Sequence, residues 1–76
     1  MMSPQDYEID VRPLPPSLGG GFVAVVPDLP GCMSDGETPQ EALENAYDAA
    51  AAWIATAAET GRDIPVSSAL EQRAVA

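Results

Sequence analysis

The first patterned segment of the chain alternates apolar and polar side chains. Between Tyr7 and Leu14, positions 7, 9 and 11 are apolar and positions 8, 10 and 12 are charged, a period of two that is typical of a strand with one buried face. Pro13 has no backbone N–H to donate, so it should close this strand. Residues 15–20 read Pro-Pro-Ser-Leu-Gly-Gly and favour a turn. The pattern predicts a strand over 7–14 followed by a hairpin connection.

The returning strand is apolar on both faces. Residues 21–26 read Gly-Phe-Val-Ala-Val-Val, which places Val23 and Val25 on the face opposite to positions 22, 24 and 26. One helix can cover only one face of a small sheet. We therefore expect Val23 and Val25 to form the interface of a homo-oligomer, either a dimer or a larger assembly.

Two short segments follow the second strand. Residues 27–31 read Pro-Asp-Leu-Pro-Gly and predict a turn, because the prolines restrict φ and Gly31 can adopt a positive φ. Cys32 to Glu37 is long enough for a third strand. Within it, Asp35-Gly36 should form a local bend before the next element.

A long amphipathic helix comes next. Thr38 is an N-cap candidate, Pro39 suits the first helical position, and Glu41 lies where a capping box needs it. Gly61 is the expected C-cap and Pro65 forbids continuation, so the helix should run over residues 39–60. The apolar residues of its buried stripe recur at spacings of three and four: Leu43, Ala46, Tyr47, Ala50, Trp53, Ile54 and Ala57.

Three features around this helix leave alternatives open. The run from Ala49 to Ala52 either lets a sheet or a second helix approach closely or reflects the high helix propensity of alanine. Trp53 is expected in the core, with an interface anchor as the alternative. Residues 66–76 are compatible with a short edge strand, a helical turn or a tail.

These elements predict one domain of the α+β class. We expect a small antiparallel sheet of about three strands packed on one long helix, with the core over residues 7–65 and a short C-terminal strand or tail. A chain of 76 residues has no room for a second globular unit.

The charge balance restricts what the domain can bind. Twelve acidic residues against three basic ones give a net charge of −9, which repels phosphate backbones and anionic lipid surfaces. We expect no direct binding of nucleic acid. The same field would attract a strongly basic protein, although it also serves simply to keep a small protein in solution.

Residues that usually carry catalysis or bind metals are scarce. The chain has no His and a single cysteine, Cys32, which excludes an intrachain disulfide, a zinc cluster and a His-activated nucleophile. Cys32 is expected to be a small core or turn residue. Asp28, Asp35 and Glu37 could form a carboxylate cluster for Mg²⁺, but each also suits its turn or helix end. We expect no catalytic residue, metal or cofactor.

The sequence also favours a cytoplasmic location. A single cysteine fits a reducing compartment. The N-terminal segment lacks the basic start and apolar run of a signal peptide, and no stretch has the roughly 18 continuous apolar residues of a membrane span.

The order of motifs resembles that of a known family. Residues 27–32 read Pro-Asp-Leu-Pro-Gly-Cys, residues 35–38 read Asp-Gly-Glu-Thr, Glu41-Ala42 opens the helix, and Ile64-Pro65 follows its end. Over Tyr7 to Pro65 this combination resembles the HicB family of antitoxins. The resemblance implies a partial ribonuclease H-like domain that neutralises a small basic toxin of the HicA type. Such a toxin is a ribonuclease that cuts messenger RNA, and the antitoxin covers its active site.

The resemblance and the charge together indicate a contact surface. The acidic residues expected to face lysines and arginines of the toxin are Glu8, Asp10, Asp28, Asp35 and Glu37. Many relatives carry a C-terminal DNA-binding module, and because the 11 residues after Pro65 are too few for one, we expect no promoter binding. The rival interpretations are a solitary homo-oligomeric structural or binding domain without a toxin, and a metal-dependent nuclease.

Overall fold

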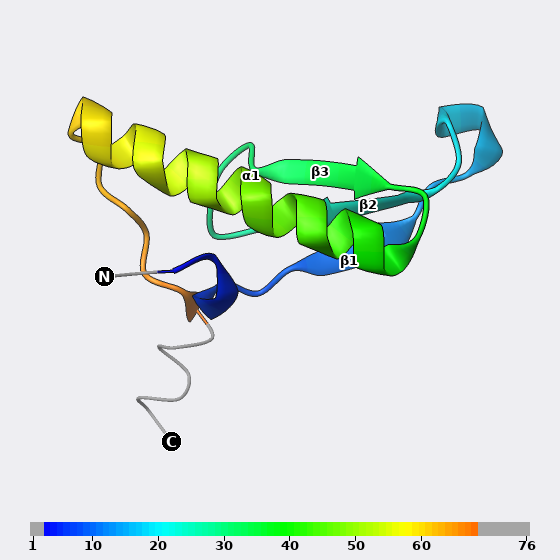
Figure 1. Ribbon diagram of the computed structural model, residues 1–76, viewed down its shortest axis with the longest axis horizontal. Coiled ribbons are helices and arrows are strands. Elements are labelled where there is room, and N and C mark those ends of the chain that lie inside the picture. The colour runs from blue at the N-terminus through cyan, green and yellow to red at the C-terminus, as the bar shows by residue number, and fades with distance from the viewer. Residues whose placement is uncertain (1–2, 69–76) are drawn as a thin grey trace, which may run out of the picture.

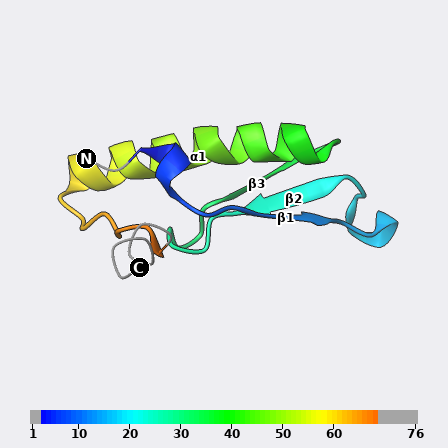
Figure 2. The same cartoon turned by 90° about the horizontal axis from the view of Figure 1, so that it is seen from below.

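A three-stranded antiparallel sheet and one long helix form the two layers of the structure (Figure 1). This computed structural model describes residues 3–68. The elements are the 3-10 helices η1 (Pro4–Asp6) and η2 (Pro16–Leu18), the strands β1 (Asp10–Pro13), β2 (Phe22–Val25) and β3 (Met33–Gly36), and the helix α1 (Pro39–Thr60). The strand order is β1-β2-β3, and α1 covers one face of the sheet (Figure 2). The predicted α+β class, with three strands on one helix, is confirmed.

Each observed strand lies inside its predicted segment. Pro13 is the last residue of β1 and pairs with Phe22, in agreement with its predicted role as a strand end. The connection to β2 contains η2 and then Gly19 at φ 104°, a left-handed conformation that favours glycine. The hydrophobic pattern does not predict η1, because η1 is a local turn. In it the Ser3 backbone N–H donates to the Asp6 carboxylate at 2.9 Å.

Both ends of α1 lie where the sequence predicts them. The Thr38 hydroxyl accepts a hydrogen bond from the Glu41 backbone N–H at 3.0 Å, and Gly61 closes the helix at φ 74°. One detail of the expected capping box differs. In a capping box the Glu41 carboxylate would accept from the backbone N–H of Thr38. Here it accepts from the backbone N–H of Glu37, the residue before the cap, at 3.4 Å.

The side of α1 that meets the sheet is made of alanines. Ala42, Ala46 and Ala50 are fully buried and pack with Ala24 of β2. Their small side chains bring the sheet close to the helix axis. Within the run 49–52, Ala50 therefore serves close packing, whereas positions 51 and 52 are exposed and are explained by helix propensity.

The turn between β2 and β3 contributes to the core. The predicted reversal over 27–31 is confirmed: Leu29 N–H donates to the Val26 carbonyl at 3.1 Å, and Cys32 N–H donates to the Leu29 carbonyl at 2.9 Å. Leu29 has no exposed surface and is the largest fully buried side chain of the described residues. Cys32 is also buried, as expected for a small core residue.

The segment after α1 returns along the start of the chain. The Tyr7 hydroxyl donates to the Pro65 carbonyl, which ties this segment to the residues just after η1. The Asp28 carboxylate accepts from the Ser68 backbone N–H at 2.9 Å and from the Ser68 hydroxyl at 2.7 Å. Val66 and Ser67 belong to no strand. The rest of the predicted strand or tail over 66–76 lies outside the described residues.

The Tyr7 contact leads to a testable prediction. Tyr7→Phe should lower the free energy of unfolding by about 1 kcal/mol at neutral pH, because it removes the hydrogen bond to the Pro65 carbonyl. Burial raises the pKa of the Tyr7 phenol above its ordinary value of 10.0, and the carboxylates of Asp28 and Asp6 raise it further. The folded state then holds this proton more tightly than the unfolded state. Stability should therefore fall as the pH rises above about 10.

Urea unfolding between about pH 8 and pH 11.5 measures both effects. The Cys32 thiol, whose pKa burial also raises, titrates in the wild type and in Tyr7→Phe alike, so the difference between the two proteins isolates Tyr7. The stability gap should narrow above about pH 10. A constant gap across this range would contradict the prediction.

Candidate functional site

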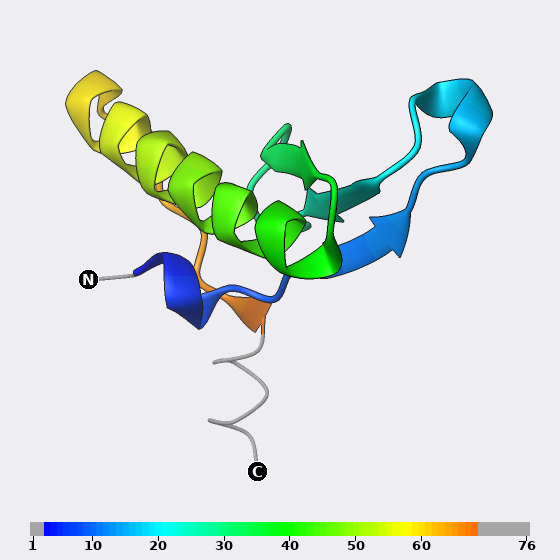
Figure 3. The ribbon, with the colours of Figure 1, turned by 45° about the vertical axis from the view of Figure 1, so that its right-hand side comes forward.

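An acidic groove lies where the hairpin connection meets the start of α1. It has a volume of about 500 Å³ and is lined by Gly19, Gly20, Gly21, Asp35, Gly36, Glu37, Glu41 and Asn45; we call these residues the acidic groove. The hairpin connection and the start of α1 lie at the same end of the molecule, and the connection projects beyond the helix (Figure 3). Three of the lining residues are carboxylates and none is basic. The groove therefore suits a cationic group.

Close backbone packing shapes the floor of the acidic groove. A Cβ at Gly21 would lie 2.7 Å from the Gly36 carbonyl oxygen, so only glycine fits there. The Asn45 side-chain amide donates to the Asp35 carbonyl at 2.8 Å and ties β3 to α1. Because these contacts use backbone atoms, the carboxylates of Asp35 and Glu37 remain exposed to a partner.

The position of the groove at a helix N-terminus matters for its charge. The first turn of α1 carries Glu41 and is preceded by Glu37. The N-terminal end of a helix has a partial positive charge, which stabilises nearby carboxylates. The fold can therefore concentrate negative charge here without destabilising α1.

The structure brings together only part of the predicted contact surface. Asp35 and Glu37 share the acidic groove. Glu8 and Asp10 are exposed at the opposite edge of the sheet, where Asp10 pairs with Val25 in β1–β2. Asp28 lies in the turn after β2, with both carboxylate oxygens bonded to Ser68. Its position is thus explained by internal contacts.

Val23 and Val25 occupy the face of the sheet that points away from α1. Ala24, between them, is buried under the helix, so the alternation of a strand turns both valines to the other side. They are half-buried between their neighbours in the strands. This is the face that sequence analysis assigns to a homo-oligomer.

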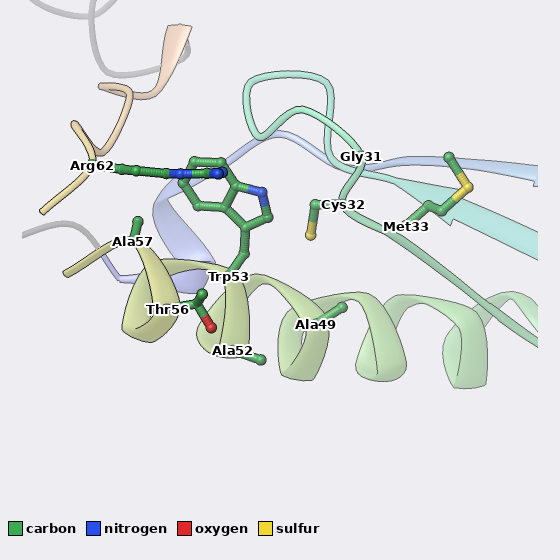
Figure 4. Close-up of a pocket in the computed structure, with 9 residues that line it drawn as sticks. All are labelled: Gly31, Cys32, Met33, Ala49, Ala52, Trp53, Thr56, Ala57 and Arg62. Carbon is green, nitrogen blue, oxygen red and sulfur yellow. The ribbon is translucent and has the colours of Figure 1, made fainter. Parts of the chain in front are cut away.

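A second, more apolar groove runs between α1 and the start of β3 (Figure 4). It has a volume of about 330 Å³. Trp53 is half-buried there and donates through its indole N–H to the Pro30 carbonyl at 3.0 Å, and Arg62 lines the same groove (Figure 4). Trp53 thus packs against the core, as expected, and keeps an exposed edge. The hydrophobic pattern does not predict Arg62 at this groove, because Arg62 lies beyond the helix and only the returning segment places it there.

The described residues 3–68 contain no cluster of side chains that could bind a metal ion. No three His, Cys, Asp or Glu side chains converge there to hold a metal ion, and Asp28 lies at the opposite end of the β2–β3 hairpin from Asp35 and Glu37. Burial raises the pKa of the Cys32 thiol above its ordinary value of 9.0, which disfavours the reactive thiolate. Neither α1 nor another helix in the described part of the chain has the length and hydropathy to cross a membrane.

Comparison with known proteins identifies the family. A model of the HicB-like antitoxins of bacterial toxin-antitoxin systems matches residues 11–76. The chain belongs to this antitoxin family. The predicted resemblance is therefore confirmed over most of the chain. Membership of an antitoxin family implies a toxin as partner. No solved structure shows a significant match.

The similar proteins are short and uncharacterised. An uncharacterised 14.9 kDa protein of Haemophilus phage HP1 is 42% identical over 55 residues, which cover 72% of this chain and 41% of the phage protein. A UPF0150 protein of Synechocystis is 40% identical over 66% of this chain and 68% of its own length. A UPF0150 protein of Thermoplasma acidophilum is 40% identical, with coverages of 68% and 75%. The chain thus matches less than half of the phage protein and most of the other two.

Proposed function

We propose that this chain is an antitoxin of a type II system that binds and neutralises a small basic toxin of the HicA type, a ribonuclease that cleaves messenger RNA. The observation that supports this most directly is an exposed acidic groove in a member of an antitoxin family. An RNA-cleaving enzyme needs a basic surface to hold its substrate. A protein with a net charge of −9 would be attracted to that surface and block it.

The proposed role is stoichiometric binding without catalysis. No step requires a metal or a cofactor, and the described residues contribute carboxylates and backbone groups as ligands for the toxin. The antitoxin would act in the cytoplasm, because the messenger RNA that the toxin cuts is found there. Of the acidic residues expected to contact the toxin, we assign the central role to Asp35 and Glu37. Glu8 and Asp10 would form a second patch. Asp28 is bonded to Ser68.

Purification of the chain from its host with whatever binds to it tests this function. The expected result is a small basic protein in a fixed ratio, whose cleavage of RNA stops when the free chain is added back. Recovery of the chain alone would favour the second candidate, a solitary homo-oligomeric domain. The half-buried Val23 and Val25, on the sheet face that points away from α1, support this candidate.

Charge reversal tests the acidic groove. The double variant Asp35→Lys/Glu37→Lys should weaken toxin binding at least about 100-fold, because two attractive contacts become repulsive. Wild-type affinity should also fall as the salt concentration rises, since exposed charges are screened. Isothermal titration calorimetry with the purified toxin measures both effects.

A matched control separates the groove from overall charge. Asp48→Lys/Glu59→Lys changes the net charge equally at exposed positions on α1 outside the groove. It should weaken binding only a few-fold. The single variant Glu37→Lys reverses one of the two contacts and should weaken binding about tenfold. Equal losses in the two double variants would assign the effect to net charge and contradict a specific groove.

A further inference from the structure

β3 is an outer strand of the sheet, and the direction of its backbone groups follows from one contact at its start. The Val26 N–H donates to the Cys32 carbonyl at 3.0 Å, so these two residues are a hydrogen-bonded pair. In an antiparallel ladder such pairs alternate with pairs that are not bonded to each other. Every second residue from Cys32 therefore bonds to β2, and the backbone groups of Met33 and Asp35 point to the outer edge.

This edge is open at Met33 and partly closed at Asp35. The Asp35 carbonyl accepts from the Asn45 side-chain amide at 2.8 Å. Within the described part of the chain, no hydrogen bond is recorded for the outward N–H and carbonyl of Met33, a residue that is 56% exposed. An edge strand with such groups can pair with an extended segment of another protein.

The apolar groove drawn in Figure 4 and the acidic groove both lie between this edge and α1. Met33 of β3 borders the apolar groove, and Asp35 borders the acidic groove. The residues of α1 that border them recur at spacings of three and four on one side of the helix: Glu41 and Asn45 at the acidic groove, then Ala49, Ala52 and Thr56 at the apolar groove. The two grooves therefore follow each other along one boundary, over about 22 Å of helix.

The alternation of strand side chains sets a spacing for what binds there. Cys32 is buried in the core with alanines of α1, so Cys32 and Gly36 face the helix side of the sheet. In an added strand, the residues opposite these two would face the same side. Cys32 lines the apolar groove and Gly36 lines the acidic groove. The two positions are four residues apart, which is about 13 Å along a strand.

We propose that an extended segment of the basic toxin adds to the edge of β3 at Met33. It places an apolar side chain in the apolar groove and, four residues away, a lysine or arginine in the acidic groove. The inference rests on the proposed function for the identity of this partner. It goes further in naming the segment's conformation, its two anchor residues and their spacing.

The charges at the two ends of the boundary select this occupant and its placement. Asp35, Glu37 and Glu41 attract a cationic side chain at the acidic groove. Arg62 lines the apolar groove and repels a cation there, so the apolar anchor belongs at that end. A second copy of this chain fits poorly, because two chains of net charge −9 repel each other.

Synthetic peptides test the spacing without a toxin. In Ser-Thr-Leu-Thr-Ser-Thr-Arg-Thr the leucine and the arginine are four residues apart, and the reversed sequence covers the opposite strand direction. In the control Ser-Thr-Leu-Thr-Ser-Arg-Thr-Thr and its reverse they are three apart, which turns the arginine to the other face of the strand. One peptide of the first pair should bind with a Kd of about 1 mM or below, and the controls at least about fivefold more weakly.

Nuclear magnetic resonance of the isotope-labelled chain measures this binding. The amide signals of Met33 and Asp35 and the indole N–H signal of Trp53 should shift as peptide is added. The proposal is overturned if the Met33 signal is unchanged at about 5 mM of both peptides of the first pair, well above the expected Kd. Equal affinities of test and control peptides would also overturn it, because they would show that the spacing does not matter.

Groove filling tests the same site in the complex with the toxin. Ala52→Trp fills the apolar groove without changing the charge and should weaken toxin binding at least about 30-fold. Ala51→Trp is the matched control: both positions are exposed on α1, and of the two only Ala52 lines the groove. The control should change the toxin affinity no more than about threefold. Similar losses in the two variants would contradict the apolar anchor.

Hydrogen exchange separates this inference from the proposed function. The Met33 amide should exchange at least about tenfold more slowly in the toxin complex than in the free chain, because it gains a partner. A toxin that binds while the Met33 amide keeps its free rate would overturn the added strand and leave the antitoxin function intact. If no toxin is found, the proposed function fails and the peptide series still decides whether the edge binds such a segment. Slowing that needs only a higher concentration of the chain itself would assign the edge to a second copy and overturn the proposal.

Discussion

Gly36→Ala should unfold the domain or lower its free energy of unfolding by about 3 kcal/mol or more, at the upper end of what overpacking costs. A Cβ at Gly36 would lie 2.5 Å from the Ala42 backbone nitrogen and 2.8 Å from the Glu41 carbonyl carbon. Both atoms belong to the first turns of α1, so relief requires a shift of the helix against β3. A domain of this size has only about 4–11 kcal/mol of stability in total.

Urea unfolding at a fixed protein concentration measures this loss. Gly20→Ala is the control for the same chemical change. No atom lies within 4 Å of a Cβ at Gly20, and its φ of +69° adds only local strain, so we expect a loss of about 1–2 kcal/mol. If Gly36→Ala were no more destabilising than Gly20→Ala, the close approach of α1 to β3 would be wrong.

Leu29→Ala should cost about 3–5 kcal/mol, as for other buried leucines. Leu29 has no exposed surface and lies in one cluster with Val26, Cys32 and Tyr7. The turn around it is fixed by two backbone hydrogen bonds, so the surrounding backbone can collapse only partly into the cavity. The lost apolar contacts and the remaining cavity both lower the stability of the folded state.

Leu18→Ala is the matched control. Leu18 is 69% exposed in the hairpin connection, so the same substitution there should change the free energy of unfolding by no more than about 0.5 kcal/mol. Thermal and urea unfolding of both variants make the comparison. Similar losses at the two positions would show that Leu29 is not part of the core.

Much of the fold follows from local sequence rules. The bounds of α1 are set by Thr38 and Gly61, which act within one turn of themselves. β1 ends at Pro13 because proline lacks a donor, wherever the rest of the chain lies. Each prediction succeeded because its cause lies within a few residues.

The two residues with the largest expected effects depend on distant packing. The sequence predicts a bend at Gly36, but the structure shows the last residue of β3 pressed against α1. Leu29 belongs to a turn motif, and turns usually run over the protein surface. The conformational preferences of turn residues explain the residues on either side of Leu29. They do not predict that the Leu29 side chain enters the core.

The candidate contact surface was predictable in composition and only partly in position. An excess of acidic residues can be counted, yet the sequence does not show that the Asp28 carboxylate bonds to Ser68, which lies 40 residues away. The sequence pattern did not predict Glu41 as a groove residue, because its position is explained by helix capping. A local capping contact places it beside Glu37, and the packing of α1 beside β3 brings it next to Asp35.

The sequence by itself determined the three strands, the long helix, the α+β class, the family and the sign of the charge, because periodicity, caps and motifs are local or additive properties. The tertiary structure decided which side chains meet. It separated Asp28 from the acidic groove, placed Leu29 in the core, and set the acidic groove and the apolar groove along one boundary between α1 and β3. Such neighbours are set by strand register and by helix–sheet distance, and these depend on how the whole chain packs.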